Sequence, residues 1–284
     1  MNGTLYAIKI GAKRGWHEQV LSLKSTQDQT FYLFFAVVTL VYMYVNRNNT
    51  VDGLDLTIPQ VALPTIVAAA VTFGLIVGPA QQIAMEREDG TVLRVLSAPR
   101  GSIAYATGHF VLNMTSLLPM LAVIMLPSVF LFDAGSQRGW SGWAAASGVL
   151  VLAFLALLPV GLVIGTLVPD VRRTTTWGIL PLLFMMAVSG IFVPLSNLWG
   201  WLQAVGQGLP LYWFAHGMRF AFLPEGAAEL ELHGEWRISM AVVALALWAI
   251  VAWTIAVATM RRVGSGVSAA SVVTARDTTA QWVR

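Results

Sequence analysis

Long runs of apolar residues without Asp, Glu, Lys or Arg alternate with short polar segments along most of the chain. A helix that crosses a membrane needs about 20 predominantly apolar residues. The pattern predicts six such helices. The apolar run of the first helix ends at Val45, and the last two residues of that helix are polar. The predicted spans are 30–47, 58–83, 103–132, 143–168, 176–195 and 238–260. We therefore expect an all-α membrane protein.

The composition supports a membrane protein and excludes several other classes. Hydrophobic residues make up 57% of the 284 residues and charged residues only 11%. Soluble domains are near 45–50% apolar and about 25% charged. The chain carries too little charge to cover a surface that faces water on all sides. A soluble enzyme, a disordered chain and a nucleic-acid-binding domain are excluded on this ground, and no nucleic-acid partner is expected.

The distribution of positive residues predicts the orientation. Six spans place both termini on the same side of the membrane. If that side is the cytoplasm, the inner segments contain all but four of the 17 Lys and Arg residues; the exceptions are Arg47, Arg138, Arg219 and Arg237. Short cytoplasmic loops are enriched in Lys and Arg. We expect cytoplasmic termini, with residues 263–284 forming a cytoplasmic tail.

Residues 1–29 precede the first span and contain an amphipathic pattern. Apolar residues recur at spacings of three and four, and basic residues lie away from that stripe, which consists of Leu5, Ile8, Ala12, Trp16, Val20 and Leu23. Such a helix suits a position in the inner membrane interface. A short soluble helix that caps the bundle is the alternative. Residues 30–262 then form the membrane domain.

Several kinds of chemistry are missing from the sequence. There is no cysteine, and none of the three lysines lies in a nucleotide-binding P-loop motif. The four histidines are scattered, so we expect no metal site and no catalytic residues. His109 lies near the inner end of the third span and is interpreted as an interfacial residue. A transporter of this composition needs an energy source on another chain.

The inner loop 81–102 carries the densest charge in the chain. Its acidic residues come before Thr91, apolar residues follow at 92, 93, 95 and 96, and Pro99 comes next. This order predicts a short amphipathic helix at about 85–98, with acidic groups near its N-terminus, where the helix dipole favours them. Its apolar face can dock into a groove of a soluble partner. An ordinary charged loop is the alternative.

This loop resembles the signature of the type-2 ABC transporter permeases, the drug-resistance exporter family that includes the daunorubicin-resistance permeases. In that family the segment forms a coupling helix that contacts a separate ATPase subunit. The resemblance assigns this role to Glu86, Arg87, Glu88, Gly90, Thr91, Leu93, Leu96 and Pro99.

The outer segment 197–236 also resembles the family, which has a run of Pro, Trp-Leu, Pro-x-x-Tyr and Arg there. The corresponding residues here include Pro194, Trp201, Pro210, Tyr212 and Arg219. The resemblance implies short helices that dip into the outer leaflet. Aromatic rings would anchor them at the interface: Trp199, Trp201, Tyr212, Trp213, Phe214, Phe220 and Phe222. A plain extracellular loop is the alternative.

The resemblance further implies a permease subunit in the plasma membrane, not itself an enzyme, that pairs with a second copy or a paralogue. Two P-loop ATPase subunits would bind ATP and Mg²⁺, and this chain would hold no cofactor. The family's path for substrate, lined by the first, second and fifth spans, is expected at Phe31, Phe34, Phe35, Tyr42, Phe184, Met185, Met186 and Phe192. Aromatic and Met side chains suit a hydrophobic or amphipathic cargo such as a drug, antibiotic or lipid.

Two other functions stay open at this point. One is export of polysaccharide or lipid-linked glycan, whose path should be lined by stacked aromatics and hydrogen-bonding groups. The other is an ATP-independent facilitator or a membrane assembly factor. A facilitator or assembly factor does not need the charged inner helix, so a Gly90→Pro change should leave its activity intact.

Overall fold

The computed structural model describes residues 3–51, 53–96, 98–135, 137–168 and 171–265. These residues form helices joined by turns, without a β-strand in the described ranges. In chain order the helices are α1 (Gly3–Ser22), α2 (Thr26–Val45), α3 (Ile58–Glu88), α4 (Thr91–Leu96), α5 (Gly101–Phe132), α6 (Gly139–Leu167), α7 (Val171–Val188), the 3₁₀ turn Leu195–Asn197, α8 (Gly200–Gly208), α9 (Pro210–Phe222), the 3₁₀ turn Glu225–Leu230 and α10 (Ile238–Ser265).

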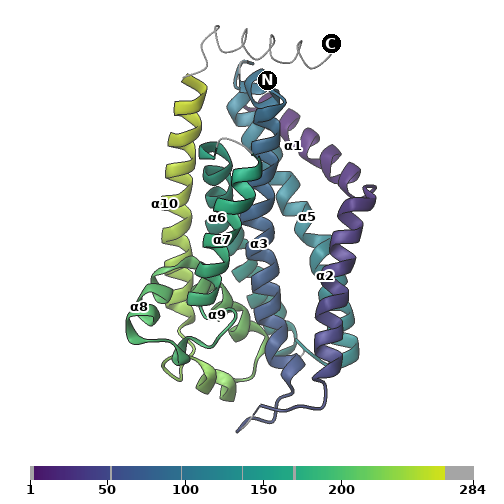
Figure 1. The fold of residues 1–284 in the computed structure, drawn as a ribbon, viewed down its shortest axis with the longest axis vertical. Coiled ribbons are helices and arrows are strands. Elements are labelled where there is room, and N and C mark those ends of the chain that lie inside the picture. Colours follow the sequence, from purple (N-terminus) through teal and green to yellow (C-terminus); the bar gives the residue numbers. More distant parts are fainter. Residues whose placement is uncertain (1–2, 52, 97, 136, 169–170, 266–284) are drawn as a thin grey trace.

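Five helices are long and apolar enough to cross a membrane, and they run roughly side by side along the long axis of the molecule (Figure 1). They are Asp28–Val45 of α2, α3, α5, α6 and Ile238–Met260 of α10. The chain is therefore an all-helical multi-pass membrane protein. The first, second, third, fourth and sixth predicted spans each fall on one of these helices.

The fifth predicted span, 176–195, differs from the structure at its C-terminal end. Helix α7 ends at Val188, and its apolar stretch covers only Gly178–Val188. Gly190 has a φ of +74°, in the left-handed region, and therefore ends the helix. Pro194, which cannot continue a helix, follows. Helix α7 runs alongside the longer helices from the upper end but is shorter than they are (Figure 1), so six spans remain a prediction.

Helices α3, α6 and α9 form the centre of the bundle. A Cβ added at Gly161 or Gly165 of α6 would lie 2.7 Å from a backbone carbonyl oxygen of α3, so the two backbones are in direct contact. Small residues allow this close approach in membranes. Helix α9 packs against α6, α10 and α3, and the side chains of 210–218 are all buried.

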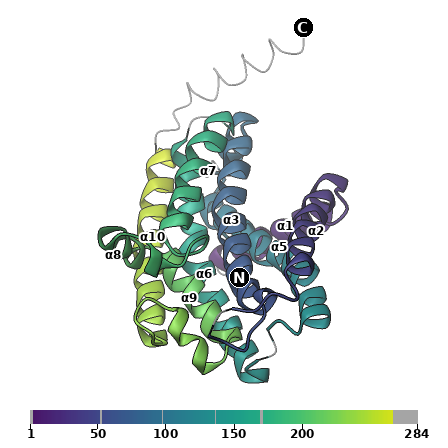
Figure 2. The same cartoon turned by 60° about the horizontal axis from the view of Figure 1, so that its bottom comes forward.

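Helix α1 lies across the upper part of α5, apart from the central helices (Figures 1 and 2). Its buried face consists of Ala7, Gly11, Gly15 and Gln19, one residue per turn. A Cβ at Gly11 would lie 2.2 Å from the Ala104 carbonyl oxygen, and one at Gly15 would lie 2.3 Å from that of Gly108. The glycines therefore let α1 lie directly on the α5 backbone.

The apolar stripe predicted on α1 points away from this contact. Leu5, Ile8, Trp16 and Leu23 are all exposed. An exposed apolar stripe beside a membrane-spanning helix fits the predicted interfacial position. The apolar stripe seen in the sequence corresponds to the exposed face of α1. The opposite face contacts α5 through Gly11 and Gly15.

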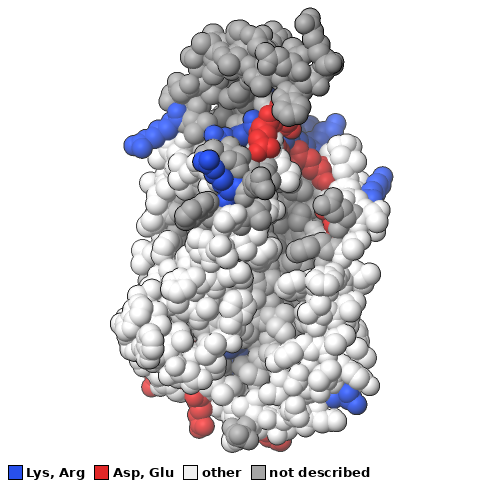
Figure 3. All heavy atoms as spheres, in the orientation of Figure 1, with Lys and Arg blue, Asp and Glu red and all other residues white. Residues whose placement is uncertain are grey.

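Charged side chains gather at the two ends of the molecule (Figure 3). The upper end, where α3 and α10 finish, carries most of the Lys and Arg visible on this face, with several Asp and Glu beside them. The middle is nearly free of charge. This banding is what a protein that spans a hydrocarbon layer requires, because charges there are costly.

We predict that Gly15→Leu detaches α1 from α5. A side chain at this position would collide with the Gly108 carbonyl oxygen, which cannot move without bending α5. In membrane vesicles with the α1 side outward, trypsin should cut at Lys9 and Lys13 at least tenfold faster than in the wild type. Gly148→Leu on α6 is the control, since nothing lies within 4 Å of its added Cβ. Equal cleavage of both variants would contradict the prediction.

Candidate functional site

The chain turns sharply between α3 and α4, at the upper end of the molecule. Gly90 has a φ of +75°, a conformation that glycine adopts without strain. Thr91 N–H then donates a hydrogen bond of 2.8 Å to Asp89 Oδ1, which satisfies the first turn of α4. Helix α4 ends at Leu96, before the exposed Pro99. A short helix at this place was predicted from the sequence.

The prediction placed the acidic residues of this loop on the short helix, and that was wrong. Glu86 and Glu88 belong to the last turn of α3, which continues past the predicted end at residue 83. Only Asp89 interacts with the start of α4. The reason is that nothing interrupts the helical backbone before Gly90.

The apolar face of α4 is directed mainly at other helices of the same chain. Val92 is buried in the central hydrophobic core, and Val95 packs against that core. The side chains of Leu93 and Leu96 lie outside the described residues. The exposed surface of the α3–α4 corner includes Glu88 at the end of α3, Asp89 in the turn and Arg94 on α4. A soluble partner would meet charged residues here.

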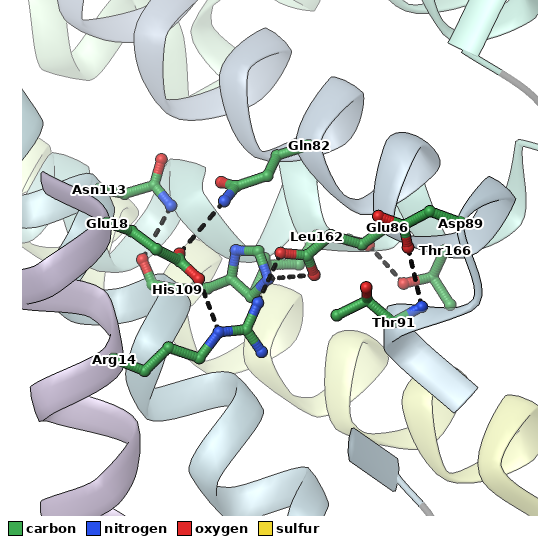
Figure 4. Close-up of polar contacts among 10 residues, drawn as sticks. All are labelled: Arg14, Glu18, Gln82, Glu86, Asp89, Thr91, His109, Asn113, Leu162 and Thr166. Atoms are coloured by element: carbon green, nitrogen blue, oxygen red, sulfur yellow. Dashed lines mark hydrogen bonds and ion pairs between the residues drawn. The ribbon is translucent and has the colours of Figure 1, made fainter. Parts of the chain in front are cut away.

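Glu86 is directed inward and is only 9% exposed. Arg14 of α1 donates a hydrogen bond of 2.7 Å from Nη2 to Glu86 Oε1 (Figure 4). The same guanidinium donates from Nε to Glu18 Oε1 at 2.6 Å. One positive charge is thus shared by two carboxylates. Because a buried carboxylate is strongly destabilising without a positive partner, this contact fixes α1 to the end of α3.

His109 of α5 is a third member of this cluster. Its Nε2 lies 3.3 Å from Glu86 Oε2, and the side chain is buried. The ring also packs edge-on against Tyr105, with 4.4 Å between the ring centroids. The interpretation of His109 as an interfacial residue was therefore wrong. A helical wheel gives no sign of this, because the partner is 23 positions away.

Arg87 points in a different direction, toward the end of α6. Its Nη1 donates hydrogen bonds to the carbonyl oxygens of Thr166 at 2.6 Å and Val168 at 3.1 Å. The last carbonyls of a helix have no partner within the helix and carry partial negative charge. The Arg87 guanidinium donates hydrogen bonds to these carbonyl groups and places a positive charge beside them.

Two consecutive residues at the end of α3 thus hold three other helices. Glu86 holds α1 and α5, and Arg87 holds α6. Directly after them, Gly90 allows the turn into α4. The corner next to α4 is therefore connected by direct polar contacts to α1, α5 and α6. We call Arg14, Glu86, Arg87 and His109 the α3-end cluster.

At the opposite end of the molecule, α8 and α9 differ strongly in burial. Trp199 and Trp201, at the start of α8, are exposed, and their place at a membrane interface stays a prediction. The anchoring role predicted for the rings of α9 was wrong for Tyr212, Trp213, Phe214 and Phe222, which are buried in the protein core. Pro210 is the first residue of α9, where its missing N–H is harmless.

Arg219 of α9 holds the segment that follows. Its Nε donates to Glu231 Oε1 at 2.5 Å, and His216 Nδ1 lies 2.9 Å from Glu231 Oε2. Burial alone would raise the pKa of Glu231, but Arg219 and His216 outweigh it and lower that pKa to about 2. Glu231 therefore stays ionised at any physiological pH and ties the 225–237 segment to α9. The sequence resemblance gave no partner for Arg219.

The residues predicted to line a substrate path lie in two separate groups. Phe34 and Tyr42 are exposed on α2, while Phe184 of α7 and Phe192 just beyond it are exposed elsewhere. Met186 is buried, and Phe35 and Met185 are partly buried. The side chain of Phe31 lies outside the described residues. Since α3 lies between α2 and α7 (Figure 2), one chain does not bring the two groups together.

No group of three or more His, Asp or Glu side chains in the described part of the chain is arranged to hold a metal ion. The structure therefore defines a multi-pass membrane protein with a charged helical corner at one end. A comparison with protein-family models matches residues 7–223 to the family described as ABC-2 type transporter. The chain belongs to this family, which confirms the resemblance seen in the sequence. No curated protein matches the chain.

Membership makes the chain a membrane permease subunit of an ABC transporter, a kind of subunit that works with an ATPase subunit. The α3-end cluster, α4 and the complete α9 lie within the matched residues, as does α1 from Ala7 onward.

We predict that Arg87→Met lowers the free energy of unfolding by about 2 kcal/mol, because charged hydrogen bonds to two carbonyls are lost in a partly buried place. Arg47→Met is the matched control: Arg47 also donates to a carbonyl at a helix end, that of Tyr44, but in an exposed place. Arg47→Met should lower the free energy of unfolding by less than about 0.5 kcal/mol. Thermal unfolding of the purified variants in detergent measures both, and equal losses would refute the role of Arg87.

Proposed function

We propose that this permease subunit exports a hydrophobic or amphipathic molecule across the plasma membrane, driven by an ATPase that docks on the α3–α4 corner. The observation that carries the proposal is the α3-end cluster. It joins an exposed, charged corner to α1, α5 and α6 by direct hydrogen bonds and ion pairs. A surface loop without a mechanical role would not need contacts of this kind.

The ATPase would bind the exposed charged residues of the corner and move α4 when it closes on ATP. Helix α4 packs between α3 and α5, so its displacement would act on both. Arg14 would pass the movement from Glu86 to α1, and Arg87 would pass it to the end of α6. ATP and Mg²⁺ would be bound by the ATPase, and this chain would contribute no cofactor.

The active permease would contain two copies of this chain, or this chain and a paralogue. The predicted path residues support this arrangement, because two exposed aromatic groups on separate faces of one chain can meet across an interface between two chains. Phe34 and Tyr42 would come from α2, and Phe184 and Phe192 from the region of α7. Such a path has mainly apolar walls, which favours an apolar or amphipathic cargo over a glycan.

The orientation follows from the positive charges. With the α3–α4 corner in the cytoplasm, the termini lie on the same side as the ATPase. The end that carries α8 and α9 then faces outward, and the exposed Trp199 and Trp201 would sit in the outer leaflet. Helix α9, buried within the bundle, would lie at membrane depth behind them.

We predict that Gly90→Pro abolishes coupling while the protein still inserts in the membrane. Proline fixes φ near −65°, whereas Gly90 has +75° and donates its N–H to the Arg87 carbonyl oxygen. The corner must therefore rearrange. After tagged purification from the native membrane in mild detergent, the wild type should retain a stoichiometric P-loop ATPase. Retention by the variant should fall at least tenfold.

Gly53→Pro is the matched control for this experiment. Gly53 has a φ of +79° in the turn between α2 and α3, at the far end of the molecule, so the backbone strain is comparable. This variant should keep the ATPase. Wild-type protein that purifies as a single chain even after crosslinking would refute the proposed function and favour a facilitator.

A further inference from the structure

A cavity of about 750 Å³ opens between α1, α2, α3 and α5. On α3 it extends over residues 73–82, in the half of the helix that leads to the α3–α4 corner, and on α5 over residues 112–120. The junction of α1 and α2 closes the remaining side. The volume is in the range that binds drug-sized molecules. Figure 3 shows the surface hollowed along the middle of the molecule.

Two glycines form part of the cavity wall. Gly74 and Gly78 lie one turn apart on α3, a spacing that usually allows two helices to touch. The structure shows otherwise: nothing lies within 4 Å of a Cβ added at Gly78, and a Cβ at Gly74 would meet only side chains at ordinary contact distance. The missing side chains leave room in the cavity instead of allowing a helix to pack.

The charged residues that line the cavity are all acidic. Glu18 and Asp28 are among its lining residues, and no Lys or Arg is, within the described part of the chain. Glu18 shares the Arg14 guanidinium with Glu86, so one positive charge serves two negative ones. Asp28 accepts its hydrogen bond of 2.6 Å from the uncharged Ser22 hydroxyl. The cavity therefore has an excess of negative charge.

The rest of the lining is suited to an organic cation. Tyr32 and Phe73 supply aromatic rings, whose faces attract cations, and Leu117 and Met120 supply apolar surface that can adapt its shape. Asn113 and Gln82 add amide groups near Glu18. An apolar chamber with carboxylates at one side recognises a molecule that is bulky, apolar and positively charged.

We propose that this cavity binds an amphipathic organic cation and that such cations are the substrate class of the permease. The positive charge is held near Asp28 and Glu18, and the apolar part lies against the wall at Gly74 and Gly78. The statement that these cations are transported rests on the proposed function. Their binding in the cavity can be tested on the permease alone.

The chain contains no cysteine, so one engineered thiol reports on the cavity. Gly78→Cys places a thiol in the open space beside α3, and Gly200→Cys, where nothing lies within 4 Å either, places one on α8 as the control. The full-length variants in phosphatidylcholine nanodiscs are labelled with a maleimide. The probes are tetraphenylphosphonium and tetraphenylborate, which have the same shape and opposite charge.

We expect saturating tetraphenylphosphonium to slow labelling of Gly78→Cys at least fivefold and to leave Gly200→Cys unchanged. Tetraphenylborate should protect neither. Adding Asp28→Asn to Gly78→Cys should raise the half-protecting concentration of the cation at least fivefold, whereas Asp55→Asn, an exposed acid in the turn between α2 and α3, should not. Equal protection by both ions, no protection, or no effect of Asp28→Asn would each overturn the cation site.

A second measurement separates this result from the proposed function. In vesicles that contain the permease with its ATPase, tetraphenylphosphonium should stimulate ATP hydrolysis, and Asp28→Asn should raise the concentration needed by a similar factor. If Gly78→Cys is protected but the wild type retains no ATPase when it is purified from the native membrane, the cavity is supported and the ABC exporter is refuted. Stimulation that Asp28→Asn does not change would overturn the cavity as the site of transported cations.

Discussion

Glu86 is a carboxylate buried at the end of a membrane-spanning helix, and most of the architecture at this end of the molecule depends on neutralising it. A charge in such a place is stable only beside an opposite charge or several hydrogen-bond donors. Arg14 supplies the charge at 2.7 Å and His109 lies at 3.3 Å. Arg14 reaches Glu86 only if α1 has one position along α5 and one rotation about its own axis. The ion pair therefore selects the register of a helix that a membrane interface alone would leave free to slide.

Glycines make that register possible. Gly11 and Gly15 bring α1 onto the backbone of α5, and Gly161 and Gly165 bring α6 onto that of α3. Where α3 carries Gly74 and Gly78, no helix approaches and a cavity results. The same residue spacing thus gives two outcomes, according to whether a second backbone lies opposite. The charged contacts fix the ends of the helices, and the glycines fix the distance between them.

The sequence predicted the parts of the structure that depend on local pattern. Apolar runs located five long helices, and the acidic residues, Thr91 and Pro99 indicated a short helix near α4 but not the turn at Gly90 that precedes it. Contacts between distant residues could not be predicted. The partner of Glu86 is 72 positions away on a helix read as an interface segment. The aromatic residues of α9 suit a membrane interface and a protein core equally well, and only the packing of α6 and α10 around α9 decides between them.

The central claim is that Arg14 and Glu86 act as one unit that joins α1 to the end of α3. A double-mutant cycle with Arg14→Met, Glu86→Gln and the combined variant, measured by unfolding in mixed detergent, tests it directly. A joined pair gives a coupling energy of about 2 kcal/mol, because the second change costs little once the first is made. Additive losses, with a coupling energy below about 0.5 kcal/mol, would mean that α1 is held by packing alone.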